Sequence, residues 1–333
     1  MLPPPTFHTE LLALAPGELR NYRTRRYHGD DIAIPVSAFS ELDQQSLGRL
    51  YTFLQALFAS LSDKGEARQL AFQRFLDTQD LEDLAGRVRQ LGAESYRLRP
   101  APLLAKTIHD VRGGGLTPLL GELELWRLGF RNSFPGDALY FLTRDHLKIM
   151  RNALLGLDDA RRNEDLEVKV HDTDFFVEKW NGTQLISGEK RVRLTVDCRQ
   201  PVAISECCVE FGALDRILYN LINNACRHTV GESIQLVVFP VPDEQGENLR
   251  FVLLNALSRE DNAYLSQTDM QTLFRAGVST TGSGYGLNVA AEFVTNAFGL
   301  SNPQDAVAGG YLGARLLHEQ FAIWFHWPIV AEY

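Results

Sequence analysis

Apolar residues repeat at helical spacing over residues 214–229, which is the clearest helix pattern in the chain. The predicted buried face consists of Leu214, Ile217, Leu218, Leu221, Ile222 and Ala225. The opposite flank carries Asn220, Asn224 and His228 at intervals of four, with Arg227 beside them. A solvated helix face is usually rich in Glu, Lys and Gln rather than Asn. Either this is a surface helix with some Asn caps, or its amide oxygens suit Mg²⁺ and its Arg and His suit phosphate.

The first hundred residues show helical patterns without chemistry of their own. The run RNYRTRRYHGDD (residues 20–31) follows a proline-rich start, and such a short charged run is typical of a solvated surface. Residues 41–92 predict helices with a break near Thr78, from the apolar positions Leu47, Leu50, Leu54, Leu57 and Leu61 and then Phe72, Phe75, Leu84, Val88 and Leu91. With RLRPAP (97–102) as a linker, residues 1–100 form a predicted N-terminal, mainly helical sensory or docking region.

Two long helices are predicted between residues 103 and 163. The first spans 103–128 with an interruption at Gly113, Gly114 and Gly115, and the second spans about 137–162. On the second helix an apolar seam lies near heptad spacing, at Leu139, Leu142, His146, Ile149, Ala153 and Leu157. Because two antiparallel helices rarely bury such seams alone, the pattern favours a dimeric four-helix bundle, so residues 101–164 form a predicted helical-hairpin dimerisation domain.

After residue 163 the hydrophobic period changes from that of helices to that of strands. Residues 191–198 alternate, residues 234–241 and 248–254 predict a hairpin, and residues 313–318 and 320–328 predict two final strands. Strands mixed with helices indicate a two-layer α/β sandwich over residues 165–333. The expected fold class is therefore α plus α/β: a helical region, a helical hairpin and a C-terminal sandwich.

Composition excludes several classes of protein. The 333 residues are 45% hydrophobic and 23% charged, as in ordinary globular proteins, and the net charge of −9 argues against general binding to nucleic acid or anionic membranes. No apolar run approaches a membrane span and no signal peptide is evident, so a cytoplasmic location is expected. Cys198, Cys207, Cys208 and Cys226 lack the spacing of a zinc site and are expected to be reduced thiols.

A glycine-rich stretch, FRAGVSTTGSGYGL (residues 274–287), precedes a predicted apolar helix at 288–298. Glycine permits close backbone approach, and a helix N-terminus presents free N–H groups to an anion. A glycine-rich stretch is weak evidence alone, but here it accompanies the Asn, Arg and His flank and a closing GGYLGA element at 309–314.

Together these motifs resemble, in order and spacing, the ATP-binding catalytic domain of sensor histidine kinases, within the GHKL ATPase superfamily. NLINNACRHT is similar to the N box, and LFRAGVSTTGSGYGL to the F box, ATP lid and second glycine box. The resemblance implies a Bergerat-type fold, with ATP and Mg²⁺ as cofactors and Asn224 as the metal ligand. It also implies nucleotide contacts from Asn220, Arg227, His228, Ser279, Thr280, Thr281, Gly282, Gly284, Gly286 and Leu287.

The chain departs from the family at the first glycine box, which is usually DxGxG with an Asp that accepts the adenine amino group. Here the hairpin leads into NALSR, so Asn255 takes the Asp position and both glycines are absent. The carboxamide oxygen of Asn255 can still accept this hydrogen bond, but it is neutral and therefore a weaker partner.

The resemblance also implies a phosphoacceptor histidine on the first helix of the hairpin. His109 lies in KTIHDVRGGGLTPLLGEL, which resembles the H box, with Asp110 as the acidic neighbour and Arg112 as a contact for a phosphoryl oxygen. Glycines follow Arg112 where the family has its helix-bending Pro. The rivals are His146, expected in the bundle core, and His171, in a connecting segment.

Three functional readings remain open at this point. The first is a cytoplasmic, homodimeric histidine kinase that autophosphorylates His109 and passes the phosphoryl group to an Asp of a response-regulator receiver domain. The second is a histidine phosphotransferase or pseudokinase that binds ATP weakly. The third is a GHKL ATPase or nucleotide-gated binding module without phosphohistidine, which the Gly-Gly-Gly run keeps open.

Overall fold

A computed structural model describes residues 5–16, 19–24, 27, 32–130, 133–187, 190–243, 246–275, 284–318 and 320–330. The chain forms two compact units. Residues 29–167 make up the helical unit. Residues 1–28 and 168–333 make up the sheet unit, which is therefore built from two separate stretches of sequence.

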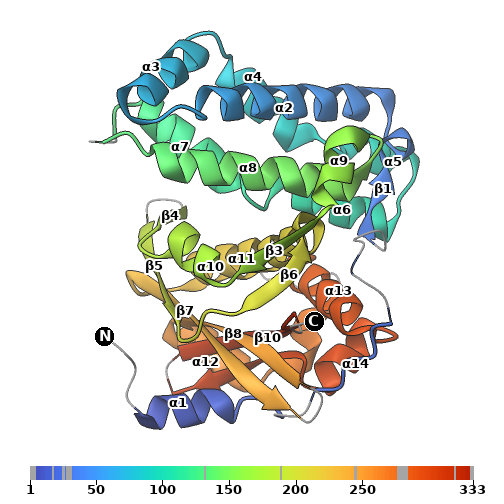
Figure 1. Ribbon diagram of the computed structural model, residues 1–333, viewed down its shortest axis with the longest axis vertical. Helices are drawn as coiled ribbons and strands as arrows, with labels where there is room; N and C mark the ends of the chain where they lie inside the picture. Colours follow the sequence, from blue (N-terminus) through green and yellow to red (C-terminus); the bar gives the residue numbers. More distant parts are fainter. Residues whose placement is uncertain are drawn as a thin grey trace. The chain divides into compact units, whose positions relative to one another are not determined.

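The helical unit is built mainly from eight helices among its described residues. Its elements are β1 (Ile34–Pro35), η2 (Val36–Ala38), α2 (Glu41–Ser60), α3 (Gly65–Leu76), α4 (Leu81–Gln90), α5 (Ala93–Leu98), α6 (Pro102–Arg112), α7 (Leu116–Arg127), α8 (Gly136–Ala153), β2 (Leu154–Leu155) and α9 (Asp159–Asp165). The long helices α2 and α8 lie side by side (Figure 1), and the short strands β1 and β2 pair in parallel. The predicted break near Thr78 is confirmed, because α3 ends at Leu76 and α4 begins at Leu81.

This grouping differs from the predicted division into three domains. Residues 29–100 and 101–167 belong to one unit, and residues 1–28 belong to the other. Only the boundary between residues 167 and 168 lies close to a predicted one, after residue 164.

The glycine run ends the first helix of the predicted hairpin instead of loosening it. Gly114 has a φ of 46°, and a Cβ there would lie 3.2 Å from both the carbonyl oxygen of Asp110 and the Cδ1 of Ile149. Only glycine combines this left-handed backbone with such close packing. The second predicted helix is also shorter than expected, since α8 ends at Ala153 and a turn through Gly156, with a φ of 81°, precedes α9.

A buried carboxylate organises the start of the helical unit. Asp43, only 3% exposed, accepts hydrogen bonds from the backbone N–H groups of Gly92 (2.7 Å) and Ser95 (2.9 Å) and from the Ser95 hydroxyl. Burial alone would raise the pKa of Asp43, but these hydrogen bonds and that from Ser40 outweigh it and lower the pKa. The network fixes the turn between α4 and α5 against α2.

The sheet unit is a mixed sheet with helices packed on it. Its elements are α1 (Pro5–Leu12), β3 (Val168–Asp172), α10 (Asp174–Trp180), β4 (Gln184–Ser187), β5 (Lys190–Cys198), β6 (Ala203–Cys207), α11 (Cys208–His228), β7 (Ser233–Asp243), β8 (Gly246–Ala256), α12 (Arg259–Ser266), η3 (Met270–Phe274), α13 (Gly286–Phe298), α14 (Pro303–Ala308), β9 (Leu312–Leu317) and β10 (Gln320–Pro328). The six strands of the main sheet have the order β4-β5-β7-β8-β10-β9. Only β5 and β7 pair in parallel within it, and β3 and β6 form a separate antiparallel pair. The predicted strands and the β7–β8 hairpin are confirmed.

The two faces of the main sheet are covered differently. On one face Phe251 of β8 stacks on Phe325 of β10, at 4.6 Å between ring centroids, and contacts Phe176 of α10. Helices α10, α11 and α13 lie on this face, and α1 lies on the opposite one (Figure 1). There Leu11 and Leu14 join a core made of Val237, Phe239, Val241, Val252, Leu254, Ala322 and Trp324. The predicted two-layer sandwich thus gains a further helical layer from the N-terminus.

The segment after α1 continues along the sheet unit as a strap, here defined as residues 19–24 and 27. The backbone N–H of Tyr22 donates to the carbonyl of Phe298, and Arg23 forms a salt bridge of 3.1 Å with the buried Glu210 of α11. Gly299, with a φ of 67°, permits this approach, because a Cβ there would lie 2.7 Å from the backbone nitrogen of Arg23. The expectation of a solvated charge run is therefore wrong for Arg23. Its partner Glu210 lies 187 positions along the chain, and the charge pattern alone does not point to it.

Candidate functional site

The Asn-bearing helix of the sequence analysis is α11, a helix of 21 residues whose predicted apolar face is buried. Its long hydrophobic stripe packs on the sheet and on α13, as the periodicity requires. Asn220 is only 5% exposed, Asn224 and His228 are half-buried, and Arg227 is exposed. The polar flank therefore runs from a buried level at Asn220 to the surface at Arg227.

The end of α11 lies beside the end of β8. The backbone N–H of Val230, just after the helix, donates to the carbonyl of Ala256 at 3.0 Å. The preceding residue, Asn255, is 3% exposed and is paired in register with Ile234 of β7 and Phe321 of β10. Side chains alternate along a strand, so Asn255 is on the same sheet face as Phe251, the face that α11 covers.

Charges near the end of α11 act on its histidine. Burial lowers the pKa of His228, the negative charge of Asp261 raises it, and the positive charge of Arg227 lowers it, with a net decrease. Asp261 belongs to α12, which Ser258 caps at its N-terminus. His228 is therefore predominantly neutral at neutral pH and is available as a hydrogen-bonding group.

The third side of the site is formed by α13 and η3, which flank the predicted lid. The side-chain amide of Asn288 in α13 donates to the carbonyl of Phe274 in η3 at 3.2 Å, which ties together the two ends of the glycine-rich stretch. The guanidinium of Arg216 in α11 lies 4.4 Å from the ring centroid of Phe293, across the contact between α11 and α13. Helix α11, which carries Asn224, thus packs against α13, which begins just after Gly284.

The predicted lid residues are only partly described. Gly284 has a φ of 71°, Gly286 begins α13, and Leu287 is half-buried. Ser279, Thr280, Thr281 and Gly282 lie outside the described residues.

Three buried carboxamides, one each on α11, β8 and α13, have a polar atom without a hydrogen-bond partner among the described residues. These atoms are the Nδ2 of Asn220 on α11, the Nδ2 of Asn255 on β8 and the Oδ1 of Asn288 on α13. Each side chain is at least nine-tenths buried. Buried polar groups nearly always have a partner, so such a set calls for a ligand or water.

The side chains present would suit a metal only together with a phosphate. Within the described ranges no group of three His, Cys, Asp or Glu residues could hold a metal ion. The half-buried Asn224 offers one neutral oxygen, and Mg²⁺ in phosphate sites characteristically takes few protein ligands and completes its shell with phosphate oxygens and water. Asn224 therefore fits Mg²⁺ that arrives with a nucleotide.

In the helical unit, the structure pairs His109 with Asp110 near the end of α6. The Nδ1 of His109 lies 3.2 Å from the Oδ1 of Asp110, whose carboxylate is buried, while the His109 side chain is 22% exposed. If Nδ1 carries the proton that this contact requires, Nε2 keeps its lone pair. Arg112 is exposed one turn further on.

The rival histidines have different surroundings. His146 on α8 is fully buried, and burial lowers its pKa to about 4 despite opposing effects from the Val111 backbone and from Asp110 and Asp145. His171 on β3 stacks on Phe211 at 4.9 Å and lies 3.4 Å from the Sγ of Cys208. His109 is the more accessible imidazole of the two in the predicted hairpin.

Sequence reasoning missed two members of the site region, Asn288 and Asp261. An Asn within an apolar helix and an Asp in the first turn of a capped helix are both common in ordinary helices, so neither gave a usable signal. Only the packing of α13 on α11 and of α12 near His228 identifies them.

Comparisons with known proteins give distant structural similarity alone. No protein-family model and no curated protein matches the chain. Among solved structures, full-length ShkA in complex with AMPPNP is similar at 17% identity and a TM-score of 0.34, over 74% of this chain and 46% of that one. The Acinetobacter baumannii histidine kinase AdeS is similar at 15% identity and a TM-score of 0.30, over 66% of this chain and 98% of that one.

The catalytic domain of histidine kinase ThkA is a third, at 15% identity and a TM-score of 0.29, over 41% of this chain and 80% of that one. This chain thus spans less than half of the ShkA chain. No described helix is long and apolar enough to cross a membrane.

Proposed function

We propose that this protein is a histidine kinase of two-component signalling that transfers the γ-phosphoryl group of ATP to His109. The sheet unit binds the nucleotide between α11, the end of β8 and the start of α13, and the helical unit presents His109. The phosphoryl group then passes to an Asp of a separate response regulator. A cytoplasmic location and the regulator as partner remain predictions.

The observation that carries the proposal is the set of unpartnered buried carboxamides. Asn220, Asn255 and Asn288 come from three elements that pack together, and each leaves a polar atom unsatisfied among the described residues. A purine nucleotide offers ring nitrogens, an amino group and hydroxyls that such atoms can bind. Arg227, exposed at the end of α11, supplies the positive charge that phosphate oxygens require.

The proposed reaction transfers the γ-phosphoryl group of ATP to the imidazole of His109. The Nε2 lone pair attacks the γ-phosphorus, the bond from that phosphorus to the β–γ bridging oxygen breaks, and ADP leaves with the bonding electrons. The proton on Nδ1 passes to the carboxylate of Asp110, 3.2 Å away, which leaves a neutral phosphoimidazole ring. Mg²⁺, when bound at Asn224, would neutralise charge on the phosphates.

Radiolabelled ATP tests the transfer directly. The wild-type protein should acquire acid-labile, alkali-stable label, and His109→Ala should lose essentially all of it because the accepting nitrogen is gone. His318→Ala, at an exposed histidine of the sheet unit, is the matched control and should label like wild type. Equal labelling of His109→Ala and wild type would refute His109 as the acceptor.

Calorimetry with a non-hydrolysable ATP analogue and Mg²⁺ tests the nucleotide site. Asn224→Ala should weaken binding about ten- to a hundredfold, since a polar contact to a charged group contributes about 1.5–3 kcal/mol. Asn223→Ala, one position earlier and on a different side of α11, should bind nearly as well as wild type. Undetectable binding of the analogue by the wild-type protein would refute the kinase proposal and favour a phosphotransferase or pseudokinase.

The neutral Asn255 favours a second candidate, a histidine phosphotransferase or pseudokinase. In this candidate a carboxamide takes the place of the carboxylate that usually accepts from the adenine amino group, so the purine is bound without a charged acceptor. Such a protein would take no label from ATP, but His109 would accept a phosphoryl group from a phosphorylated response regulator. A GHKL ATPase without phosphohistidine would instead hydrolyse ATP equally well in His109→Ala.

A further inference from the structure

The predicted dimer seam of the helical hairpin is covered within a single chain. On α8, the residues Leu139, Leu142, His146, Ile149 and Ala153 are all buried. Four helices of the same unit pack on α8, namely α2, α6, α7 and the following helix α9. A second copy of the chain is therefore not needed to cover this seam.

Helix α2 has the length and the apolar face needed to replace a second copy. It has 20 residues against 18 in α8, and the two lie side by side (Figure 1). Its stripe of Leu47, Leu50, Leu54, Leu57 and Leu61 is no more than 2% exposed at any position. The apolar face of α2 is thus buried within the chain, and α2 packs along α8.

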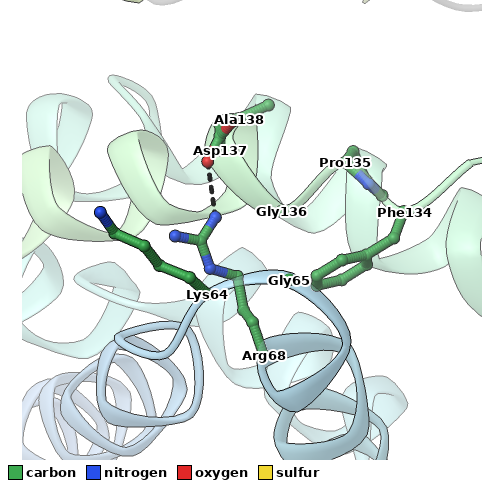
Figure 2. A pocket seen from close by; sticks show the side chains of 8 residues that line it. All are labelled: Lys64, Gly65, Arg68, Phe134, Pro135, Gly136, Asp137 and Ala138. Atoms are coloured by element: carbon green, nitrogen blue, oxygen red, sulfur yellow. Dashed lines mark hydrogen bonds and ion pairs between the residues drawn. The ribbon is translucent and has the colours of Figure 1, made fainter.

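Polar contacts fix this arrangement at both ends of α8. At its start, Arg68 of α3 forms a salt bridge of 2.5 Å with Asp137, beside an open hollow of about 580 Å³ (Figure 2). Just beyond its end, the hydroxyl of Tyr51 on α2 donates to the Oδ2 of Asp158 at 2.8 Å. Both contacts join the first hundred residues to the predicted hairpin.

Aromatic packing joins the same two parts. Phe58 of α2 stacks on Tyr140 of α8 with ring centroids 5.0 Å apart. Phe72 of α3 contacts Trp126 of α7 and Phe134, and the Trp126 indole N–H donates to Gln73 at 3.2 Å. Among the described residues, none of the exposed large apolar side chains lies on α6 or α8. These two helices therefore leave no apolar seam for a second chain in the part that the structure describes.

We propose that α2, α6 and α7 pack around α8 as a helical bundle within one chain and that the protein acts as a monomer. In that case residues 29–100 are the structural partner of the hairpin, in place of a second copy. Resting on the proposed function, it follows that the phosphoryl group moves from the nucleotide to His109 of the same chain.

Light scattering during size-exclusion chromatography, with sedimentation velocity, tests the bundle without any variant. A single species of 37.4 kDa is expected from micromolar concentrations upward. A species of twice that mass would overturn the proposal. This measurement requires no enzymatic activity, so it decides the bundle even if the proposed kinase function fails.

Mixing two defective chains tests the route of the phosphoryl group. The His109→Ala chain keeps the nucleotide site, and the Asn224→Ala chain keeps the acceptor. For a monomer, the mixture should take up no more label than the two chains alone, and the wild-type rate per chain should not change on dilution. Label on Asn224→Ala chains that appears only in the mixture would overturn the proposal. If the wild-type protein takes up no label from ATP, the proposed function is refuted instead.

Discussion

Replacing Arg250 with methionine should lower the free energy of unfolding of the sheet unit by about 3–5 kcal/mol, the cost typical of breaking a buried charged network. The Arg250 side chain on β8 is fully buried. Its guanidinium donates to the carbonyls of Leu11 and Leu12 at 2.7 Å and to those of Ala15 and Pro16 at 3.2 and 3.3 Å. Methionine would fill the space but leave these carbonyls unpaired beneath the sheet.

His326 completes this network and shows why arginine is needed. The Nδ1–H of His326 donates to the carbonyl of Tyr311 at 2.9 Å, so its Nε2 accepts from the Nε of Arg250 at 2.8 Å. Burial and the charge of Arg250 lower the pKa of His326 to about 3, which keeps the ring neutral. Burial lowers the pKa of Arg250 only to about 10, so its positive charge persists at neutral pH opposite the carbonyl end of α1.

Urea unfolding followed by tryptophan fluorescence measures this loss, because Trp180, Trp324 and Trp327 all belong to the sheet unit. Arg315→Met, at an exposed position of β9 in the same sheet, is the control and should change stability by less than about 0.5 kcal/mol. Limited proteolysis should also cut residues 5–27 faster in Arg250→Met. If both variants unfold at the same urea concentration and are cut at the same rate, Arg250 does not anchor the N-terminus.

Replacing Gly92 with alanine should destabilise the helical unit by about 2–5 kcal/mol, from left-handed backbone strain and overpacking together. Gly92 has a φ of 84°, and a Cβ there would overlap the Cδ1 of Ile108. Ile108 is the residue before His109, so the same contact seats the part of α6 that carries the proposed phosphoacceptor.

Gly86 provides a control of opposite sign. It lies inside α4, and a Cβ at this position would have no neighbouring atom within 4 Å, so Gly86→Ala should raise helix stability by about 0.5–1 kcal/mol. A second substitution, Ile108→Ala, should recover part of the loss in Gly92→Ala by removing the clash but not the backbone strain. Thermal unfolding of the four proteins checks this, and equal stability of Gly92→Ala and Gly86→Ala would exclude the proposed seating of α6.

Several elements of the sheet unit could be predicted from the sequence because their signals are local. The alternation at 191–198 and the paired runs around the turn of the hairpin correspond closely to β5, β7 and β8. The same holds for α11, whose apolar face is as long as the periodicity indicates. Of the residues in these motifs, Asn224 lies on α11 and Gly284 lies two positions before α13, a helix that packs on α11.

What could not be predicted depends on partners far apart in the chain. The apolar seam of α8 showed that a face is buried, but an amphipathic pattern does not tell whether α2 or a second copy covers it. The sequence of the strap shows only a run of basic residues. It does not show that Arg23 binds Glu210, and nothing around Arg250 shows that it binds the end of α1. The side-chain environments of Asn255 and Asn288 likewise arise from packing between distant elements.

The docking of α1 on the sheet affects how the protein folds during its synthesis. The carbonyl of Leu11 and the guanidinium that binds it are 239 positions apart, so α1 leaves the ribosome long before β8 exists. The leucines of α1 therefore stay uncovered while the helical unit is synthesised, and folding of the sheet unit closes a very long loop once β8 has emerged. A fragment starting at residue 168 would lack this helix and would expose Val237, Phe239 and Trp324 to solvent, which favours aggregation.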